Sequence, residues 1–278
     1  MTINCKGSLI DLSAPKVMGV LNLTPDSFYD GGKYKNESQI LSQVEKMLAD
    51  GATFIDIGAY SSRPGATNIS EEEEVKRIVP IIELVLEKIP SVVLSIDTFR
   101  SKVASESLDR GAALINDISA GKLDENMMFT VAKYQVPYVM MHMKGTPQNM
   151  KQMTTYKDLL KEIVFYFSER VNEARAHKIN DIIIDPGFGF AKNVQQNFHL
   201  LANLNLLQNI DLPILAGLSR KSMIYKTLKT TPQEALNGTT ALNMLALHNG
   251  ANILRVHDVK EAMECITLFN ELQAAHNY

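Results

Sequence analysis

The side chains in this sequence that could perform chemistry follow short apolar segments, at the positions where those segments end. Three cationic groups stand in the last quarter of the chain, at Lys221, Arg255 and His257. Such groups donate charge-assisted hydrogen bonds to phosphate oxygens, so together they predict an anion site. Asn22 ends the first apolar segment. Its amide oxygen is a ligand type suited to a Mg²⁺ ion that keeps most of its waters.

Two carboxylates and an amide end three other apolar segments, at Asp97, Asn116 and Asp185. A carboxylate can accept hydrogen bonds from an amino group and a neighbouring ring N–H at the same time, which is planar bidentate recognition. This set therefore predicts a subsite for a flat heterocycle with several N–H donors. Together with the anion site, it indicates a phosphorylated heterocyclic substrate.

The apolar segments themselves recur roughly every 34 residues, the length of one strand and one helix. They are short, rich in β-branched residues and uniformly apolar, which is typical of parallel strands covered by helices on the outside. The predicted strands are Val17–Leu21, Phe54–Ile57, Val92–Ile96, Leu114–Ile118, Tyr138–Met141, Ile182–Ile184, Ile214–Leu218 and Ile253–Val256.

Helical patterns fill the intervals between these strands. The clearest begins at Ser70, because Glu73 three residues later completes a capping-box pattern. Within it, we expect the acidic run Glu71–Glu74 to be a solvated first turn, and Pro80 to kink the helix or reset its start. The other predicted helices are Ser38–Asp50, Thr155–His177, Pro232–His248 and Val259–Gln273.

Eight strands alternating with helices predict one α/β domain over residues 1–278, a (β/α)₈ barrel. A doubly wound sheet would usually carry a glycine-rich phosphate fingerprint after its first strand, and this chain has none there. We expect the opening segment Thr2–Leu12 to form a hairpin that closes the barrel floor. Functional groups of such barrels lie at the C-terminal ends of the strands, where the polar residues stand in this sequence.

Composition narrows the possible classes of protein. The chain has 28 Lys and Arg against 31 Asp and Glu, for a net charge of −3, which argues against a nucleic-acid partner. Cys5 and Cys265 have no metal-ligand spacing, and we interpret them as reduced thiols. The N-terminus lacks the pattern of a secretion signal, and no apolar stretch is long enough for a membrane helix. We therefore expect a cytoplasmic enzyme with no membrane association.

Nine stretches, in this order, resemble the dihydropteroate synthase family. They are MGVLNLTPDSFYDGG, SSRPGA, SIDTFRSKVA, INDISA, VMMHMKG, DPGFGFAK, LAGLSRKS, NGTTALN and ILRVH. The resemblance implies a (β/α)₈ barrel that joins 4-aminobenzoate to (7,8-dihydropterin-6-yl)methyl diphosphate, giving 7,8-dihydropteroate and diphosphate. It also implies a cation-like pterin intermediate, a Mg²⁺ cofactor and a homodimer.

The resemblance further implies roles for individual residues. The implied pterin site comprises Asp97, Asn116, Met141, Asp185, Phe190 and Lys221. The implied diphosphate site comprises Asn22, Ser62, Arg63, Arg255 and His257, with Asn22 also the magnesium ligand. The implied aminobenzoate site comprises Phe28, Ser62, Pro64, Phe190, Ser219 and Lys221. The implied catalytic residues are Asp30, Asp97, Lys221, Arg255 and His257.

Two departures from the family pattern and several alternatives stay open. The family more often has Glu and Thr where this chain has Tyr60 and Ser62. Asp56 could either satisfy donors inside the barrel or act in the site, and His142 could either be a core histidine or contact substrate. A pterin-binding methyltransferase module that passes a methyl group to a corrinoid, or a non-catalytic pterin-binding barrel, would share the pterin carboxylates.

Overall fold

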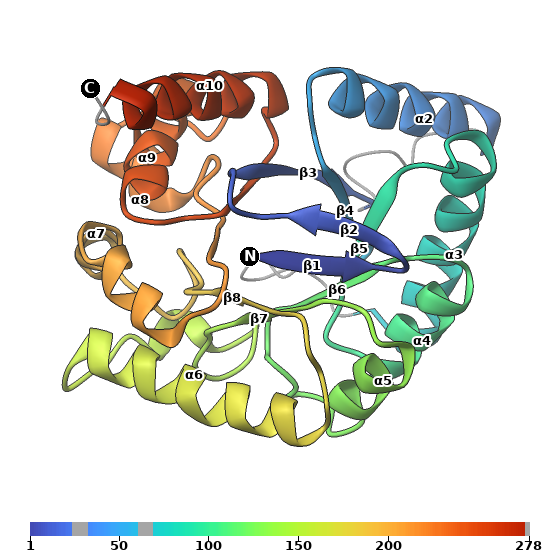
Figure 1. Ribbon diagram of the computed structural model, residues 1–278, viewed down its shortest axis with the longest axis horizontal. Helices are drawn as coiled ribbons and strands as arrows, with labels where there is room; N and C mark the ends of the chain where they lie inside the picture. Colours follow the sequence, from blue (N-terminus) through green and yellow to red (C-terminus); the bar gives the residue numbers. More distant parts are fainter. Residues whose placement is uncertain (24–32, 61–68, 276–278) are drawn as a thin grey trace.

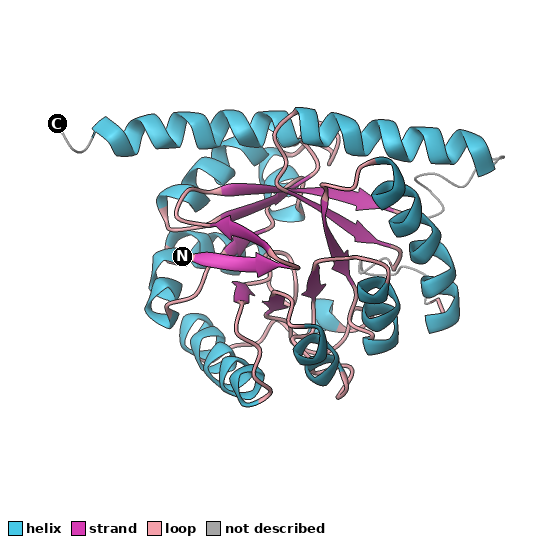
Figure 2. Cartoon of the chain, turned by 45° about the vertical axis from the view of Figure 1, so that its right-hand side comes forward, coloured by secondary structure: helices cyan, strands magenta, loops and turns pink. Residues whose placement is uncertain are grey.

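The structure, a computed structural model, describes residues 1–23, 33–60 and 69–275. Within these ranges, eight parallel strands lie inside a ring of helices (Figures 1 and 2). The strands are β3 (Lys16–Asn22), β4 (Phe54–Gly58), β5 (Val93–Asp97), β6 (Leu114–Asp117), β7 (Tyr138–Met141), β8 (Ile182–Asp185), β9 (Leu215–Ala216) and β10 (Ile253–Val256).

The eight strands close into a barrel. From β3 to β8, each strand pairs with the next one along the chain, and β10 lies between β9 and β3. A parallel bridge between Ile184 and Ile214 joins β8 to the segment before β9, and the Ile184 N–H donates to the Pro213 carbonyl at 2.9 Å. The predicted (β/α)₈ barrel is confirmed, although β9 is only two residues long where five were expected.

Nine α-helices cover the barrel in the described ranges. They are α2 (Lys33–Ala49), α3 (Glu71–Lys88), α4 (Ser101–Asp109), α5 (Met127–Tyr134), α6 (Leu159–Ala176), α7 (Val194–Ala202), α8 (Ser222–Leu228), α9 (Leu236–His248) and α10 (Val259–Ala275). Two 3₁₀ helices, Met150–Gln152 and Leu204–Ile210, precede α6 and β9. None of the helices in the described ranges is long and apolar enough to cross a membrane.

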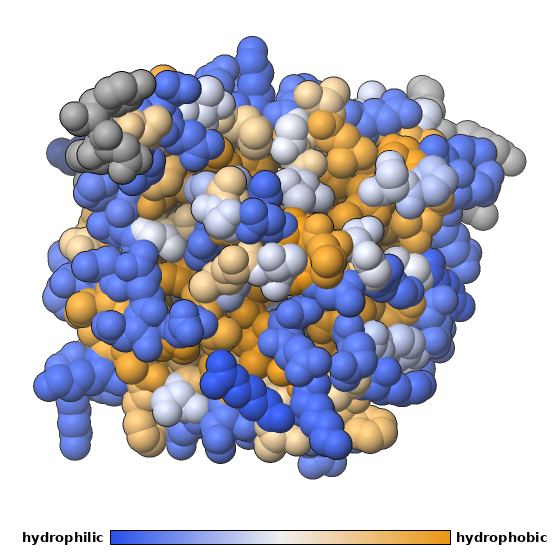
Figure 3. Space-filling model, viewed as in Figure 1, coloured by the Kyte–Doolittle hydropathy of each residue, from blue (hydrophilic) through white to orange (hydrophobic). Residues whose placement is uncertain are grey.

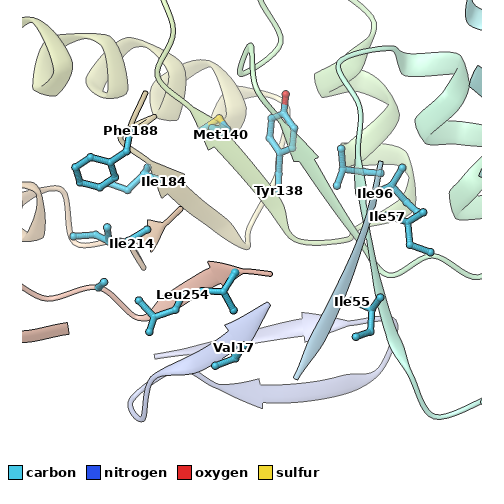
Figure 4. Packing of buried hydrophobic residues seen from close by; sticks show 14 of the residues in the cluster. Val17, Ile55, Ile57, Ile96, Tyr138, Met140, Ile184, Phe188, Ile214 and Leu254 are labelled. Atoms are coloured by element: carbon cyan, nitrogen blue, oxygen red, sulfur yellow. The ribbon is translucent and has the colours of Figure 1, made fainter. Parts of the chain in front are cut away.

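Strand residues alternate between the helix layer and the barrel interior, because successive side chains of a strand point to opposite faces. On β4, Ile55 and Ile57 belong to the large apolar cluster that the strands share with the helices, and Figure 4 shows Ile57 beside Ile96 of β5. Phe54 belongs to a second cluster inside the barrel. Asp56, two residues after Phe54, therefore also faces the interior.

The floor of the barrel is apolar. An antiparallel hairpin of β1 (Thr2–Cys5) and β2 (Ser8–Asp11) crosses this end of the barrel (Figure 1). Ile3 and Cys5 of β1 and Leu12 pack with interior residues from the starts of the strands. Polar side chains surround the edge of this face, with apolar side chains visible nearer its middle (Figure 3). The predicted hairpin is confirmed, and it leaves the opposite end of the barrel for polar groups.

Helix α3 corrects two expectations. Ser70 caps it as predicted, its Oγ accepting from the Glu73 N–H at 3.2 Å. Pro80, however, does not reset the start of the helix, which runs through it from Glu71 to Lys88. It lies on the exposed face, where water can satisfy the carbonyl that a proline leaves without a partner. Glu74 is fully buried rather than solvated, because its carboxylate accepts from Thr98 Oγ1 at 2.8 Å and pairs with Arg100 at 2.6 Å.

Candidate active site

The interior beyond the apolar floor is polar, and Arg255 of β10 lies at its centre. The Arg255 Nε donates to Asp56 Oδ2 at 2.6 Å, and its Nη2 donates to Asp97 Oδ2 at 2.7 Å. Burial alone would lower the pKa of Arg255, but the two carboxylates outweigh it and raise the pKa. The guanidinium therefore stays charged and is held by two strands, β4 and β5, which are the second and third neighbours of β10 in the barrel.

Asp56 binds more than one partner. It is fully buried and also accepts from Ser95 Oγ at 2.5 Å and from Asn116 Nδ2 at 3.0 Å. One carboxylate thus connects β4, β5, β6 and β10. This geometry settles the alternative left open by the sequence, because Asp56 satisfies donors inside the barrel and orients Arg255.

Asp97 ends β5 and pairs in register with Asn116 of β6. Burial raises the pKa of Asp97, the nearby Arg255 charge opposes that shift, and Asp56 adds to it. The net result is a pKa above the ordinary aspartate value. A ligand that brings N–H donors or positive charge to Asp97 would therefore stabilise the charged form of this carboxylate.

Asp185 and Lys221 form the second charged part of the interior. Asp185 is almost fully buried, and its Oδ1 accepts from the Gly187 N–H at 2.7 Å. Burial raises its pKa, and Lys221 opposes the shift. Lys221 precedes α8; its ammonium donates to the Phe188 carbonyl and lies 5.1 Å from the centre of the Phe190 ring. Burial lowers the pKa of Lys221 to about 8, while Asp185 works against that change.

An apolar wall adjoins these charges. Met141 of β7 lies in a small buried cluster against which the half-buried Phe190 packs. Beside it, outside the charged interior, a cavity of about 530 Å³ is lined by His142, Tyr166 and residues of α6. None of Asp97, Asp185, Lys221 or Arg255 lines that cavity. The charged residues and the apolar wall, not this cavity, therefore define the candidate site.

At the ends of β9 and β10, Ser219 and His257 form a pair. Ser219 Oγ lies 2.9 Å from His257 Nδ1, and the His257 backbone N–H donates to the same oxygen at 3.2 Å. The residues that follow Ser219 and His257 are joined as well, because Arg220 binds Asp258 at 2.6 Å. These two contacts fix the imidazole, which is exposed, at the edge of the barrel mouth.

Comparisons with known proteins agree with this geometry. A family model described as "Pterin binding enzyme" matches residues 18–257. Dihydropteroate synthase of Escherichia coli strain K12 is 40% identical over 268 residues, covering 96% of this chain and 94% of that protein. The Haemophilus influenzae dihydropteroate synthase is also 40% identical, covering 97% and 98% of the two chains.

The chain belongs to the dihydropteroate synthase family. The family's enzymes are transferases. Solved structures of the family superpose closely. The Yersinia pestis dihydropteroate synthase in complex with a sulfonamide drug has a TM-score of 0.92 and 42% identity, covering 99% of this chain and 100% of that one. The Xanthomonas albilineans dihydropteroate synthase with 4-aminobenzoic acid has a TM-score of 0.91 and 37% identity, covering 98% of each chain.

The structure brings together most of the residues to which the dihydropteroate synthase resemblance gave roles. The barrel interior and its wall hold Asp97, Asn116, Met141, Asp185, Phe190, Lys221 and Arg255. The strand ends around them hold Asn22, Ser219 and His257. Five positions, Phe28, Asp30, Ser62, Arg63 and Pro64, lie outside the described residues.

Tyr60, the first departure from the family pattern, is buried among one aromatic and two polar side chains. Its exposed fraction is 8%, its ring meets Phe99 edge-on at 5.0 Å, and Arg100 lies 5.2 Å above it. Its hydroxyl accepts from Gln148 Nε2 at 2.8 Å. Tyrosine therefore fits this position through packing and one hydrogen bond, where a glutamate would bring a charge.

Sequence reasoning missed three residues that organise the dihydropteroate synthase site. Ser95 and Lys192 were given no role, and Asp56 was left undecided. Ser95 and Asp56 could have been found by extending the two-residue alternation of β4 and β5, which places both inside the barrel. Lys192 carried no such signal, because it lies after the strand in the DPGFGFAK stretch, where its burial depends on tertiary packing.

Proposed function

We propose that this chain condenses (7,8-dihydropterin-6-yl)methyl diphosphate with 4-aminobenzoate, releasing diphosphate and forming 7,8-dihydropteroate. One observation carries the proposal. Asp97, Asp185, Lys221 and Arg255 come from four different strand ends, yet their charges act on one another inside one barrel. Two carboxylates beside two cations suit a substrate that joins a donor-rich heterocycle to an anion.

The pterin would bind between the charges and the apolar wall. Asp185 offers its second carboxylate oxygen to the amino and ring N–H groups of the pterin, while Asn116 contributes an amide. Lys221 donates to the ring carbonyl or to a ring nitrogen. Met141 and Phe190 pack against the flat ring. Because water is excluded there, each of these hydrogen bonds is stronger than it would be in solvent.

The residues around the mouth would act on the departing diphosphate. Breaking the C–O bond leaves positive charge on the pterin and adds negative charge to the leaving group. His257 and Arg255 stabilise the diphosphate through charge-assisted hydrogen bonds. Asp97, whose charged form Arg255 favours, offsets the positive charge on the pterin. The resemblance alone gives Asp30 the same role of offsetting the positive charge on the pterin.

Asn22 fits a role as magnesium ligand. The described ranges hold no group of three or more His, Cys, Asp or Glu side chains that could bind a metal on their own. Mg²⁺ is commonly held by one or two protein oxygens together with substrate phosphates and water, so a single amide at the mouth is a suitable donor set. Bound there, the ion would neutralise charge on the diphosphate.

The amine of 4-aminobenzoate would attack the pterin methylene carbon as the neutral aniline. It loses its proton after the C–N bond forms, so no dedicated base is needed. Ser219, Phe190 and Lys221 are the described residues expected near the aminobenzoate. Phe28, Ser62 and Pro64 complete the subsite by resemblance alone. We further propose that the enzyme is a cytoplasmic homodimer.

The test is a direct assay of diphosphate release from the pterin diphosphate in the presence of magnesium and 4-aminobenzoate. Product should form with one diphosphate per 7,8-dihydropteroate. A methyltransferase module would release no diphosphate, and a non-catalytic barrel would bind a pterin without turnover. Either result would overturn the proposal.

A further inference from the structure

Lys192 is a buried lysine to which the proposed reaction gives no role. Its exposed fraction is 7%. Its ammonium lies 3.0 Å from the Gly187 carbonyl, 3.1 Å from the Phe190 carbonyl and 3.1 Å from Nδ1 of His142. A buried charge is costly unless such partners are present, so the structure places this lysine against three acceptors at once.

Two of those acceptors belong to the segment Gly187–Phe190, which joins Asp185 to the apolar wall. Three other backbone groups of this segment are also bound. The Gly187 N–H donates to Asp185, the Phe188 carbonyl accepts from Lys221, and the Gly189 N–H donates to Asn197 Oδ1 at 2.6 Å. The segment is thus fixed from the pterin side by Asp185 and Lys221 and from behind by Lys192.

Backbone geometry shows how tightly the segment is seated. Gly187 has φ +70°, and a Cβ added there would lie 2.2 Å from the His142 carbonyl oxygen. The backbone of this segment therefore touches the strand end that carries His142, at a distance that only glycine permits. Any change in how Lys192 bridges His142 and the segment would shift this contact.

We propose that Lys192 is a positioning residue for the pterin subsite, acting through the Gly187–Phe190 carbonyls on the Asp185 carboxylate and the Phe190 ring. The inference rests on the proposed function, because it takes the ligand of that subsite to be a pterin. Lys192 itself contacts neither the pterin diphosphate nor the amine of 4-aminobenzoate. It fixes the position of the segment that connects Asp185 to Phe190, the two residues that contact the pterin.

His142 belongs to the same unit. Its Nδ1 accepts from the Lys192 ammonium, which leaves the proton of the neutral ring on Nε2. Burial and the Lys192 charge lower the pKa of His142, so the ring stays neutral. The ring meets Tyr166 edge-on at 4.8 Å, and the Tyr166 hydroxyl donates to the Met141 carbonyl at 2.9 Å. Lys192 is therefore connected to both parts of the apolar wall, Met141 and Phe190.

The first test measures pterin affinity in Lys192→Met, which keeps the length of the side chain and removes its donors. Titration calorimetry with 6-hydroxymethylpterin, without 4-aminobenzoate, should show at least a tenfold weaker affinity than the wild type. Lys122→Met is the matched control, because Lys122 lies over the Tyr166 ring nearby and lines the neighbouring cavity. Its pterin affinity should match the wild type.

A double-mutant cycle separates positioning from a general loss of packing. If Lys192 acts through Asp185, Lys192→Met should weaken pterin affinity much less in an Asp185→Asn background than in the wild type. Equal effects in the two backgrounds, or an unchanged affinity in folded Lys192→Met, would refute the inference.

A second pair of variants covers the case in which Lys192→Met does not fold. His142→Asn keeps an acceptor for the ammonium, whereas His142→Leu removes it. The first should bind the pterin nearly as the wild type does, and the second at least tenfold more weakly; equal affinities would contradict the inference. A wild type that binds 6-hydroxymethylpterin without releasing diphosphate in the full assay would refute the proposed function alone. A wild type that does not bind the pterin would overturn both.

Discussion

Asp56 and Arg255 are joined by a 2.6 Å bond between Oδ2 and Nε, although 199 residues separate them along the chain. The hydrogen bond joins β4 to β10, which have β3 between them, and the Asp56 carboxylate is fully buried. It fixes the direction in which the guanidinium approaches Asp97, so the parts of the site proposed to bind the anion and the pterin share one support. Asp56 is thus a structural requirement of the site, although it needs no contact with substrate.

Asp56→Asn should destabilise the fold. It leaves the Arg255 guanidinium with one carboxylate partner instead of two, and the groups of Ser95 and Asn116 that donate to Asp56 would meet a neutral amide, which is a poorer acceptor. Breaking a buried pair from one side typically costs about 3–5 kcal/mol. Because the Arg255 side chain is about one-fifth exposed, we expect the lower end, roughly 3 kcal/mol. Urea unfolding measures the change.

The control for this prediction is Asp50→Asn, which breaks the pair between the exposed Lys46 of α2 and Asp50, the residue that follows that helix. Exposed pairs contribute about 0–1 kcal/mol, so this variant should unfold nearly as the wild type does. If both variants lost the same small amount, Asp56 would not be the support that the geometry describes.

Asp185→Asn should weaken binding of 6-hydroxymethylpterin by about 1.5–3 kcal/mol, the range for a hydrogen bond to a charged group. The amide keeps one acceptor oxygen, which the Gly187 N–H already uses in the wild type. It would then present an N–H group toward the donors of the pterin. Calorimetry tests this directly, and wild-type affinity in a folded variant would remove Asp185 from the pterin site.

The fold was predictable from sequence because its strands are short apolar runs that alternate with helical patterns, and the barrel follows from eight such units. The charged cluster was predictable as a set of residue types, such as Asp97 and Arg255, at strand ends. The pairing of Arg255 with Asp97 was not predictable, because it depends on which strands lie close to one another around the barrel. For the same reason, the acidic run gave no sign that Glu74 pairs with Arg100, which lies beyond the next strand.

Arg255→Ala should lower turnover more than it weakens binding of 6-hydroxymethylpterin, which lacks the diphosphate. The guanidinium would stabilise charge on the departing diphosphate, an interaction that strengthens as the C–O bond breaks. We expect at least a hundredfold loss in kcat and a much smaller change in pterin affinity. Arg255→Lys, which keeps a charge near Asp56, serves as the comparison. Equal losses in both measurements would make Arg255 purely structural and place the anion subsite elsewhere.

The pH dependence of catalysis should report Lys221. Burial lowers the pKa of Lys221 to about 8 from its ordinary value of 10.5. In the unfolded chain, Lys221 keeps its proton up to its ordinary pKa of 10.5. Between pH 8 and 10.5, unfolding therefore takes up a proton, and the contribution of Lys221 to the free energy of unfolding rises with pH. Activity should change in the opposite direction, because the charged ammonium is a stronger donor than the neutral amine to the ring carbonyl or ring nitrogen of the pterin.

We therefore expect kcat/KM for the pterin diphosphate to fall as pH rises through about 8, since this ratio reports ionisations of the free enzyme and substrate. Lys221→Arg keeps its charge throughout this range, because arginine stays protonated in proteins. Its profile should remain flat from pH 7.5 to 9.5, even if its absolute rate is lower. A wild-type decline that persisted unchanged in Lys221→Arg would show that another group controls the alkaline limb.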